Sequence, residues 1–135
     1  MYYDSIPIDT LVGKTLKSVV VDKENKFGDE IKFTTTEGKC YMMRHEQDCC
    51  EDASIDDIAG DLDDLVGSPI LDARMETNSD KPQPKEYDES WTWTFYILAT
   101  IKGTVTLRWY VSSNGYYSEE VTFREAEDDT LHARR

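Results

Sequence analysis

The sequence predicts an α+β domain: an antiparallel sheet of about six or seven strands with one amphipathic helix packed across it. Three features lead to this prediction. Apolar residues recur at spacings of three and four between residues 55 and 66, which places them on one side of a helix. Residues 91–101 alternate between an aromatic and aliphatic face and a face rich in threonine, as in a strand. Turn motifs separate further strand-like runs before and after the helix.

The predicted helix lies in the central stretch of the chain, residues 44–71. Ser54 precedes the apolar pattern as its N-cap, and Gly67 followed by Pro69 ends the helix. Asp56 and Asp57 fall in the first turn, where the helix dipole favours negative charge. The apolar stripe consists of Ile55, Ile58, Leu62, Leu65 and Val66.

Three strands are predicted before the helix. Residues 5–16 form a turn or short helix that leads into the first strand, at residues 16–22. Residues 31–36 alternate as a second strand, and a turn at residues 37–38 leads into a third strand at residues 39–44. We expect these three strands to be antiparallel neighbours.

The remaining strands follow the helix. We predict them at residues 70–77, 91–101, 104–111 and 117–123, with a polar loop at residues 78–88. Because both faces of residues 91–101 are partly apolar, we expect this strand to lie in the centre of the sheet.

The chain of 135 residues has the size of one domain. We predict a single domain over residues 1–124 and a polar, disordered tail over residues 125–135. No run of about 20 apolar residues that could span a bilayer occurs, and the N-terminus lacks the pattern of a secretory signal. These features predict a cytoplasmic protein that does not bind membranes.

Negative charge dominates the composition. The formal net charge is -13, from 28 acidic and 15 basic residues, and nine Asp or Glu but no Lys or Arg lie between His45 and Leu65. Such a field repels the phosphate backbone, so we do not expect direct binding of nucleic acid. The acidic helix face either keeps the protein in solution or binds a basic site on another protein. In the second alternative the binding residues are Asp56, Asp61, Asp63 and Asp64.

Cysteine and histidine cluster before the predicted helix without the spacing of a known site. Cys40, His45, Cys49 and Cys50 could bind zinc, but adjacent cysteines leave the chain no room to wrap around an ion. The odd number of cysteines disfavours a disulfide framework, so we expect reduced thiols, no metal and no cofactor. His45 could activate a thiol, but no glycine-rich elbow or oxyanion loop accompanies it, and we do not expect an enzyme.

A ligand pocket is a further alternative. Arg108 lies on an aromatic-rich strand and Asn114 lies in the turn after it, so that strand and turn offer a bidentate cation, stacking surfaces and turn amides. These groups suit a nucleotide-like molecule, although packing within a sheet would also explain the aromatic residues. The residues expected to bind the ligand are His45, Gln47, Asp48, Trp93, Arg108, Asn114 and Tyr116.

Four motifs within residues 39–123 resemble a family of small proteins encoded mainly by bacteriophages and prophages. They are QDCCE at residues 47–51, GDLDDLVGSPIL at 60–71, TWTFY at 92–96 and SNGYYSE at 113–119. The resemblance implies an accessory protein by which a phage disarms host defence. A sheet with an arginine and aromatic pocket is also similar to the Thoeris anti-defence sponges, which assemble as oligomers and sequester cyclic ADP-ribose signals.

Two functional hypotheses follow. In the first, the protein is a homo-oligomeric, non-catalytic sponge in the host cytoplasm. It would hold a nucleotide-derived signal of the cyclic ADP-ribose type between the QDCCE turn, Arg108 and the SNGYY turn. In the second, the acidic residues bind a host defence protein and inhibit it by occupying a basic site or by mimicking nucleic acid.

Overall fold

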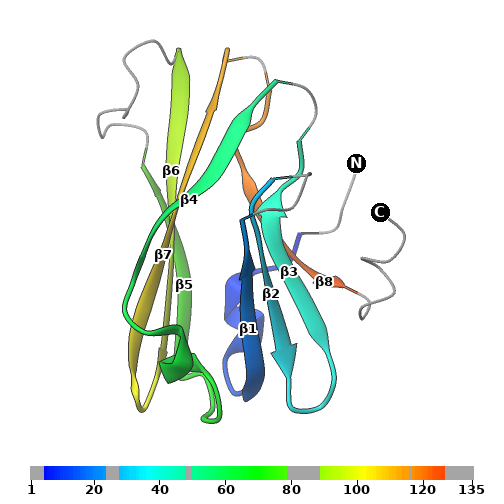
Figure 1. The fold of residues 1–135 in the computed structure, drawn as a ribbon, viewed down its shortest axis with the longest axis vertical. Helices are drawn as coiled ribbons and strands as arrows, with labels where there is room; N and C mark the ends of the chain where they lie inside the picture. Colours follow the sequence, from blue (N-terminus) through cyan, green and yellow to red (C-terminus); the bar gives the residue numbers. More distant parts are fainter. Residues whose placement is uncertain (1–4, 24–27, 48–49, 79–88, 116, 127–135) are drawn as a thin grey trace.

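The computed structural model describes residues 5–23, 28–47, 50–78, 89–115 and 117–126. In this part of the chain, eight strands form two four-stranded antiparallel sheets. The two sheets lie face to face as the layers of a β-sandwich (Figure 1). The hydrophobic core lies between these layers.

The first sheet contains the three strands predicted before the helix. β1 (Leu16–Asp22), β2 (Glu30–Thr35) and β3 (Cys40–His45) pair in sequence order, so these three predictions are confirmed. β8 (Val121–Ala126) completes the sheet by pairing with β3. The sheet order β1-β2-β3-β8 therefore joins the beginning and the end of the described chain.

The second sheet has the order β4-β7-β6-β5. β6 (Ser90–Thr100) and β7 (Gly103–Ser113) form a long hairpin at its centre, as the sequence predicts. β5 (Asp72–Asn78) pairs with β6 and forms one edge, and β4 (Asp52–Ala59) pairs with β7 and forms the other.

The predicted amphipathic helix is wrong, and so is the α+β class. Residues 52–59 form β4, and only a four-residue 3-10 helix, η2 (Leu62–Leu65), follows it. The physical reason is a β-bulge: Ile55 pairs with Trp109 and Asp57 pairs with Arg108, so Asp56 is an extra residue. The bulge shifts the alternation by one position. Consequently Ile55 and Ile58 both face the core although they are three residues apart, which imitates helical spacing.

The inner faces of the two sheets supply the core. Trp109 is fully buried there, and its indole N–H donates to the Sδ of Met43 across the sandwich at 3.3 Å. Phe123 of β8 stacks on Tyr41 with ring centroids 5.4 Å apart. The residues of β6 that join this core are Tyr96 and Leu98. The aromatic face of β6 that begins at Trp91 therefore points away from the core.

The last strand differs from the prediction at both of its ends. The predicted last strand at residues 117–123 begins only at Val121, and β8 continues to Ala126, two residues into the predicted tail. Residues 127–135 lie outside the described part of the chain. A second short 3-10 helix, η1 (Ile8–Leu11), precedes β1. Among the described residues, no helix has the length and apolar character needed to cross a membrane.

Candidate functional site

The inner face of β6 changes character halfway along the strand. Tyr96 and Leu98 belong to the core, whereas Ser90, Thr92 and Thr94 on the same face carry hydroxyl groups. Thr94 is buried, but Ser90 and Thr92 are only partly covered, because β8 begins only at Val121 and an irregular segment precedes it. A cavity forms at this end of the sandwich.

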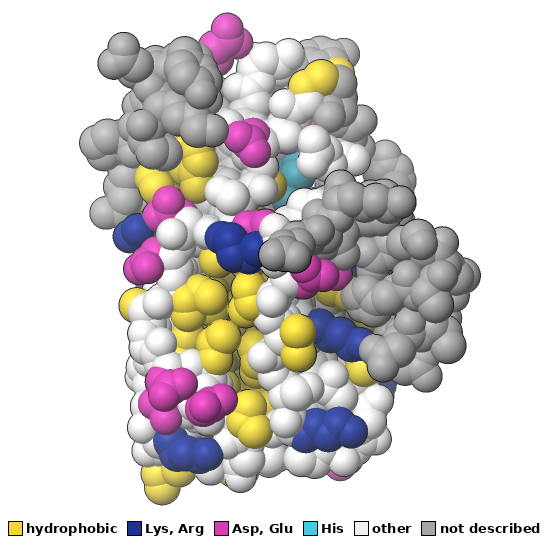
Figure 2. Space-filling view, in the orientation of Figure 1, with side chains coloured by type: hydrophobic (Ala, Val, Ile, Leu, Met, Phe, Trp, Pro, Cys, Tyr) yellow, Lys and Arg dark blue, Asp and Glu magenta, His cyan; other side chains and the backbone are white. Residues whose placement is uncertain are grey.

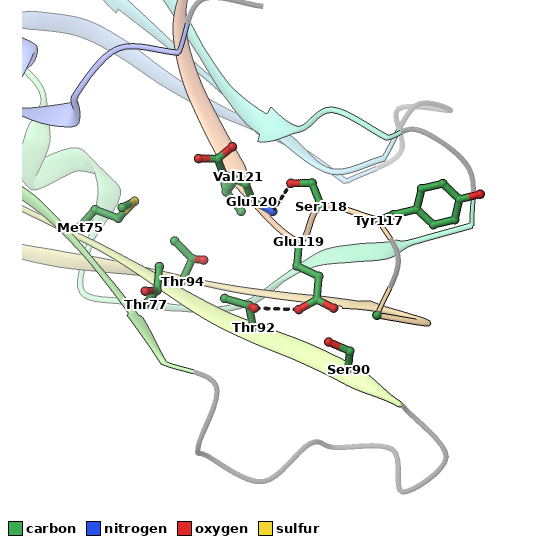
Figure 3. Close-up of a pocket in the computed structure, with 11 residues that line it drawn as sticks. Met75, Thr77, Ser90, Thr92, Thr94, Tyr117, Ser118, Glu119, Glu120 and Val121 are labelled. Carbon is green, nitrogen blue, oxygen red and sulfur yellow. Dashed lines mark hydrogen bonds between the residues drawn. The ribbon is translucent and has the colours of Figure 1, made fainter. Parts of the chain in front are cut away.

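This cavity has a volume of about 510 Å³ and lies between β5 and β6 on one side and Gly115 with residues 117–121 on the other (Figure 3). We call it the hydroxyl groove. Five of its lining side chains carry aliphatic hydroxyl groups, two are carboxylates, and Tyr117, Met75 and Val121 add an aromatic ring and apolar surface. The hydroxyl and carboxylate side chains are Thr77, Ser90, Thr92, Thr94, Ser118, Glu119 and Glu120.

Glu119 is fixed in the wall of the groove by two neutral donors. The Thr92 hydroxyl donates to one carboxylate oxygen at 2.7 Å, and the Ser113 hydroxyl donates to the other at 2.6 Å. Ser113 Oγ also accepts the N–H of Gly115 at 2.9 Å, so the same serine holds the turn after β7. An ionised carboxylate offers about four acceptor positions, so these bonds leave about two for a ligand.

The electrostatic character of the hydroxyl groove is negative. Glu119 and Glu120 supply carboxylates, and no Lys or Arg occurs among the described residues that line the groove. Hydroxyl groups can both donate and accept hydrogen bonds. The groove therefore favours a ligand that donates hydrogen bonds and carries positive charge, and it disfavours phosphate.

A second cavity, of about 520 Å³, continues the groove along the same side of the sandwich. Both cavities are lined by Met75, Glu120 and Val121, so they meet at these residues. Tyr96 lies at the bottom of the second cavity and donates its hydroxyl hydrogen to the Val121 carbonyl at 3.2 Å. Burial, with a smaller contribution from the Glu120 carboxylate, raises the pKa of Tyr96 far above its ordinary value. Tyr96 therefore remains a neutral donor.

Two of the predicted ligand-binding residues meet on the outer face of the second sheet. The Arg108 guanidinium lies over the Trp93 ring at 5.5 Å, and Trp93 packs against Tyr110 with centroids 4.7 Å apart. Arg108 Nε and Nη2 donate to Asp56 Oδ2 at 2.9 and 2.6 Å. Because alternate residues of β7 point to opposite faces, Arg108 lies on the face opposite the hydroxyl groove. We call these residues the outer-face cluster.

The other predicted ligand residues lie elsewhere. His45 is buried: its Nδ1 lies 2.7 Å from the Glu120 carbonyl, and its Nε2 lies 3.6 Å from a Glu51 carboxylate oxygen. Gln47 donates to the Glu51 carbonyl at 2.8 Å. His45 thus links Glu51 to Glu120, the residue before β8. Asn114 is exposed in the turn after β7, and Asp48 and Tyr116 lie outside the described residues.

The acidic residues predicted to bind a partner do not share a helical face. Asp56 is the bulge residue bound to Arg108. Asp61 caps η2 by accepting the Asp63 N–H at 3.0 Å, and Asp63 is exposed beside it. Asp64 packs against the β6–β7 hairpin, where its backbone carbonyl accepts the Thr100 hydroxyl. Asp56 therefore lies on β4, whereas the other three lie at η2.

The cysteines also differ from expectation. Cys40 is a free, buried thiol, but Cys50 is disulfide-bonded, so the prediction that all thiols are reduced is wrong. Cys49 lies outside the described residues. Within the described part of the chain, no group of three or more His, Cys, Asp or Glu side chains is arranged to hold a metal ion.

The residues that form the hydroxyl groove were not predicted from the sequence. Two signals were available. Ser90, Thr92 and Thr94 repeat a hydroxyl at every second position of a strand, which marks one face as polar where the next residues of that face are apolar. Ser118 and Glu119 follow the SNG turn, but the prediction assigned that segment to the last strand.

A protein-family model described as a domain of unknown function, DUF7448, matches residues 9–123. No curated protein and no solved structure matches the chain.

Proposed function

The chain belongs to the DUF7448 family, and we propose that it is a non-catalytic binding protein that holds a positively charged, hydrogen-bond-donating ligand in the hydroxyl groove. An organic cation with primary ammonium or guanidinium groups has the required chemistry. The proposal depends on the environment of the Glu119 carboxylate. This carboxylate lines the groove, has only neutral hydroxyl donors among the described residues, and retains about two acceptor positions.

The surroundings of Glu119 support the same ligand class. The lining hydroxyls can accept hydrogen bonds from an ammonium group, and Met75 and Val121 provide apolar contact for a short alkyl chain. The net charge of -13 raises the local concentration of cations around the protein. The absence of catalysis remains a prediction from the sequence.

Spermidine and argininamide are suitable probes, with glucose and AMP as neutral and anionic comparisons. We expect calorimetric titration in 150 mM salt, a condition near physiological ionic strength, to detect the two cations and neither comparison compound. Glu119→Gln should weaken cation binding about ten- to hundredfold, because a hydrogen bond to a charged group contributes about 1.5–3 kcal/mol. Equal binding of AMP, or an unchanged affinity in the variant, would contradict the proposal.

The matched control is Glu37→Gln. Glu37 is exposed next to β2 and does not line the hydroxyl groove, but its substitution changes the net charge by the same amount. The control should bind both cations like the wild type. If both variants weaken binding equally, cations are attracted to the overall charge and not held by Glu119.

The nucleotide sponge is a second candidate, with its site at the outer-face cluster. One observation favours it: the indole N–H of Trp93 is buried, and no described residue accepts its hydrogen. A ligand acceptor beside Arg108 and Tyr110 could satisfy it. Against this site, Arg108 is already bound to Asp56, so a phosphate would have to compete with that carboxylate.

The fold and the family match neither support nor oppose several of the sequence predictions. Phage or prophage origin, residence in the host cytoplasm, homo-oligomerisation and a nucleotide-derived ligand stay predictions. Inhibition of a host defence protein through Asp56, Asp61, Asp63 and Asp64 also stays a prediction. Its residues belong to two elements, because Asp56 lies on β4 and the other three lie at η2.

A further inference from the structure

We propose that the free edge of β5 receives an extended, basic peptide as an additional strand, with every second peptide side chain entering the hydroxyl groove. This inference rests on the proposed function, since it uses the same groove and the same preference for positive charge. It adds the class of ligand, a peptide segment, and the way in which its backbone is held.

The backbone of β5 has one edge that is not used in the sheet. β5 pairs with β6 on one side only. Among the described residues, no hydrogen bond other than those of that pairing reaches the backbone of residues 73–77. Unpaired N–H and C=O groups in a row are a template for another strand.

The other three sheet edges are partly occupied. At the β4 edge, the Asp29 carboxylate accepts the N–H of Ile55, and Lys23 donates to the Ile55 carbonyl. At the β8 edge, the Phe123 carbonyl accepts the N–H of Ile6 at 2.7 Å.

β1 has a bulge between Leu16 and Ser18, and the Leu16 carbonyl accepts the N–H of Gly67. Side chains, bulges and neighbouring segments of this kind are the means by which proteins protect edge strands from pairing. η1 packs against β5, but among the described residues it forms no hydrogen bond with the backbone of residues 73–77, so β5 is the edge best suited to pairing.

The two cavities lie beside β5. They follow one another along β5 and share Met75, Glu120 and Val121. Met75 points toward the groove (Figure 3), yet it is 48% exposed, because the facing sheet does not cover this edge. The seven residues of β5 span about 23 Å at about 3.3 Å per residue. A strand added there would run alongside both cavities.

The lining of the two cavities is rich in negative charge. Asp9, Glu119 and Glu120 line the two cavities and are all acidic. Arg74 of β5 also lines the second cavity, but it binds Asp72 at 3.1 Å and Glu76 at 3.2 Å. Its charge is therefore already compensated on the outer side of the strand. Lysine or arginine side chains of a peptide would meet carboxylates in the groove.

Another side of the molecule, which carries an apolar surface, is a weaker candidate for peptide binding. Apolar side chains gather in the middle of the visible face, which is the side seen in Figure 1 with β1 and β4 in front (Figure 2). At this face the edge of β4 is bound by Asp29 and Lys23. The β5 side combines a free edge, a groove and charge, so we assign the peptide to it.

The test uses the full chain and a seven-residue peptide of alternating lysine and threonine, acetylated and amidated at its ends. The matching peptide with glutamate in place of lysine is the charge control. Two further peptides are N-methylated at either all lysines or all threonines. They keep the charge, but each loses the N–H groups of one strand edge. We expect the lysine peptide to bind, the glutamate peptide not to bind, and the two methylated peptides to differ in affinity at least tenfold.

Two protein variants complete the experiment. Met75→Arg places positive charge in the groove and should weaken the lysine peptide at least tenfold. Val20→Arg is its control, because Val20 is an apolar residue of an edge strand with similar exposure, 53%, outside the groove. Retention of the wild-type melting temperature by both variants establishes that binding and not folding has changed.

The outcomes separate this inference from the proposed function. Glu119-dependent binding of spermidine together with equal affinity for both methylated peptides would leave the proposed function intact and overturn strand addition. If neither spermidine nor the lysine peptide binds, the proposed function and strand addition are both overturned. A protein dimer that Met75→Arg dissociates, with no peptide binding, would assign the edge to a second copy and also overturn the inference.

Discussion

Gly60 distinguishes the observed β-sandwich from the helix that the sequence predicts. In the structure Gly60 follows β4 with a φ of +103°, and a Cβ placed there would lie 2.5 Å from the Thr104 carbonyl oxygen. In the predicted helix, Gly60 would lie between Ile58 and Leu62 in the helix interior. Alanine would then stabilise the protein by about 0.5–1 kcal/mol. The two folds therefore predict opposite signs for Gly60→Ala.

In the sandwich, two effects contribute to the stability that Gly60→Ala should lose. A positive φ costs a residue with a Cβ about 1–2 kcal/mol. The contact with Thr104 involves backbone, which cannot rotate away, and overpacking of this kind costs about a further 1–3 kcal/mol. Gly60→Ala should therefore lower the free energy of unfolding by about 2–5 kcal/mol.

Gly38→Ala is the control, because Gly38 also has a positive φ, of +92°, but nothing lies within 4 Å of its Cβ position. Gly38→Ala should lose only the cost of the positive φ, about 1–2 kcal/mol of unfolding free energy. Urea unfolding followed by tryptophan fluorescence measures both variants against the wild type. Equal losses in the two variants would contradict the close approach of residue 60 to Thr104. A gain in stability for Gly60→Ala would contradict the strand itself.

Two further predictions concern single side chains. Tyr96→Phe should lower the free energy of unfolding by about 1 kcal/mol at pH 7, because it removes the hydrogen bond to the Val121 carbonyl. Since burial raises the pKa of Tyr96, the unfolded state loses this proton first, and wild-type stability should fall as the pH rises above about 10. Urea unfolding between pH 7 and 11 should show a shallower fall in Tyr96→Phe; identical slopes would refute this linkage. The sponge hypothesis predicts that cyclic ADP-ribose raises the Tm of the wild type but not of Arg108→Ala. No shift in the wild type would count against it.

Most strands could be predicted from the sequence because their periodicity is local. β1, β2, β3, β6 and β7 each contain an alternating or β-branched run bounded by turn residues, and each lies where the pattern indicates. β4 was misassigned because its bulge depends on pairing with β7, a contact across about 50 residues that no local pattern records. The division into two sheets depends on the same kind of long-range pairing.

The candidate site could be predicted only in part. Arg108 and Trp93 were expected to act together, and they do lie in contact. Their partner Asp56 was assigned to a helix, so its ion pair with Arg108 was missed. The two faces of β6 offer different candidate surfaces, and the sequence prediction considered only the aromatic one. The aromatic face carries Trp93 of the predicted pocket, whereas the threonine face lines the groove, because the facing sheet leaves Ser90 and Thr92 partly exposed.

The pairing of charges explains why the groove and the outer-face cluster should select different ligands. Arg108 is bound through two nitrogens to one Asp56 oxygen, so an incoming anion gains little unless it displaces that carboxylate. Glu119 forms no ion pair with any described residue, and its hydroxyl partners leave its negative charge uncompensated. A cation about 4 Å away would gain about 4 kcal/mol at an effective dielectric constant of about 20, before desolvation is subtracted. The larger gain is therefore available to a cation in the hydroxyl groove.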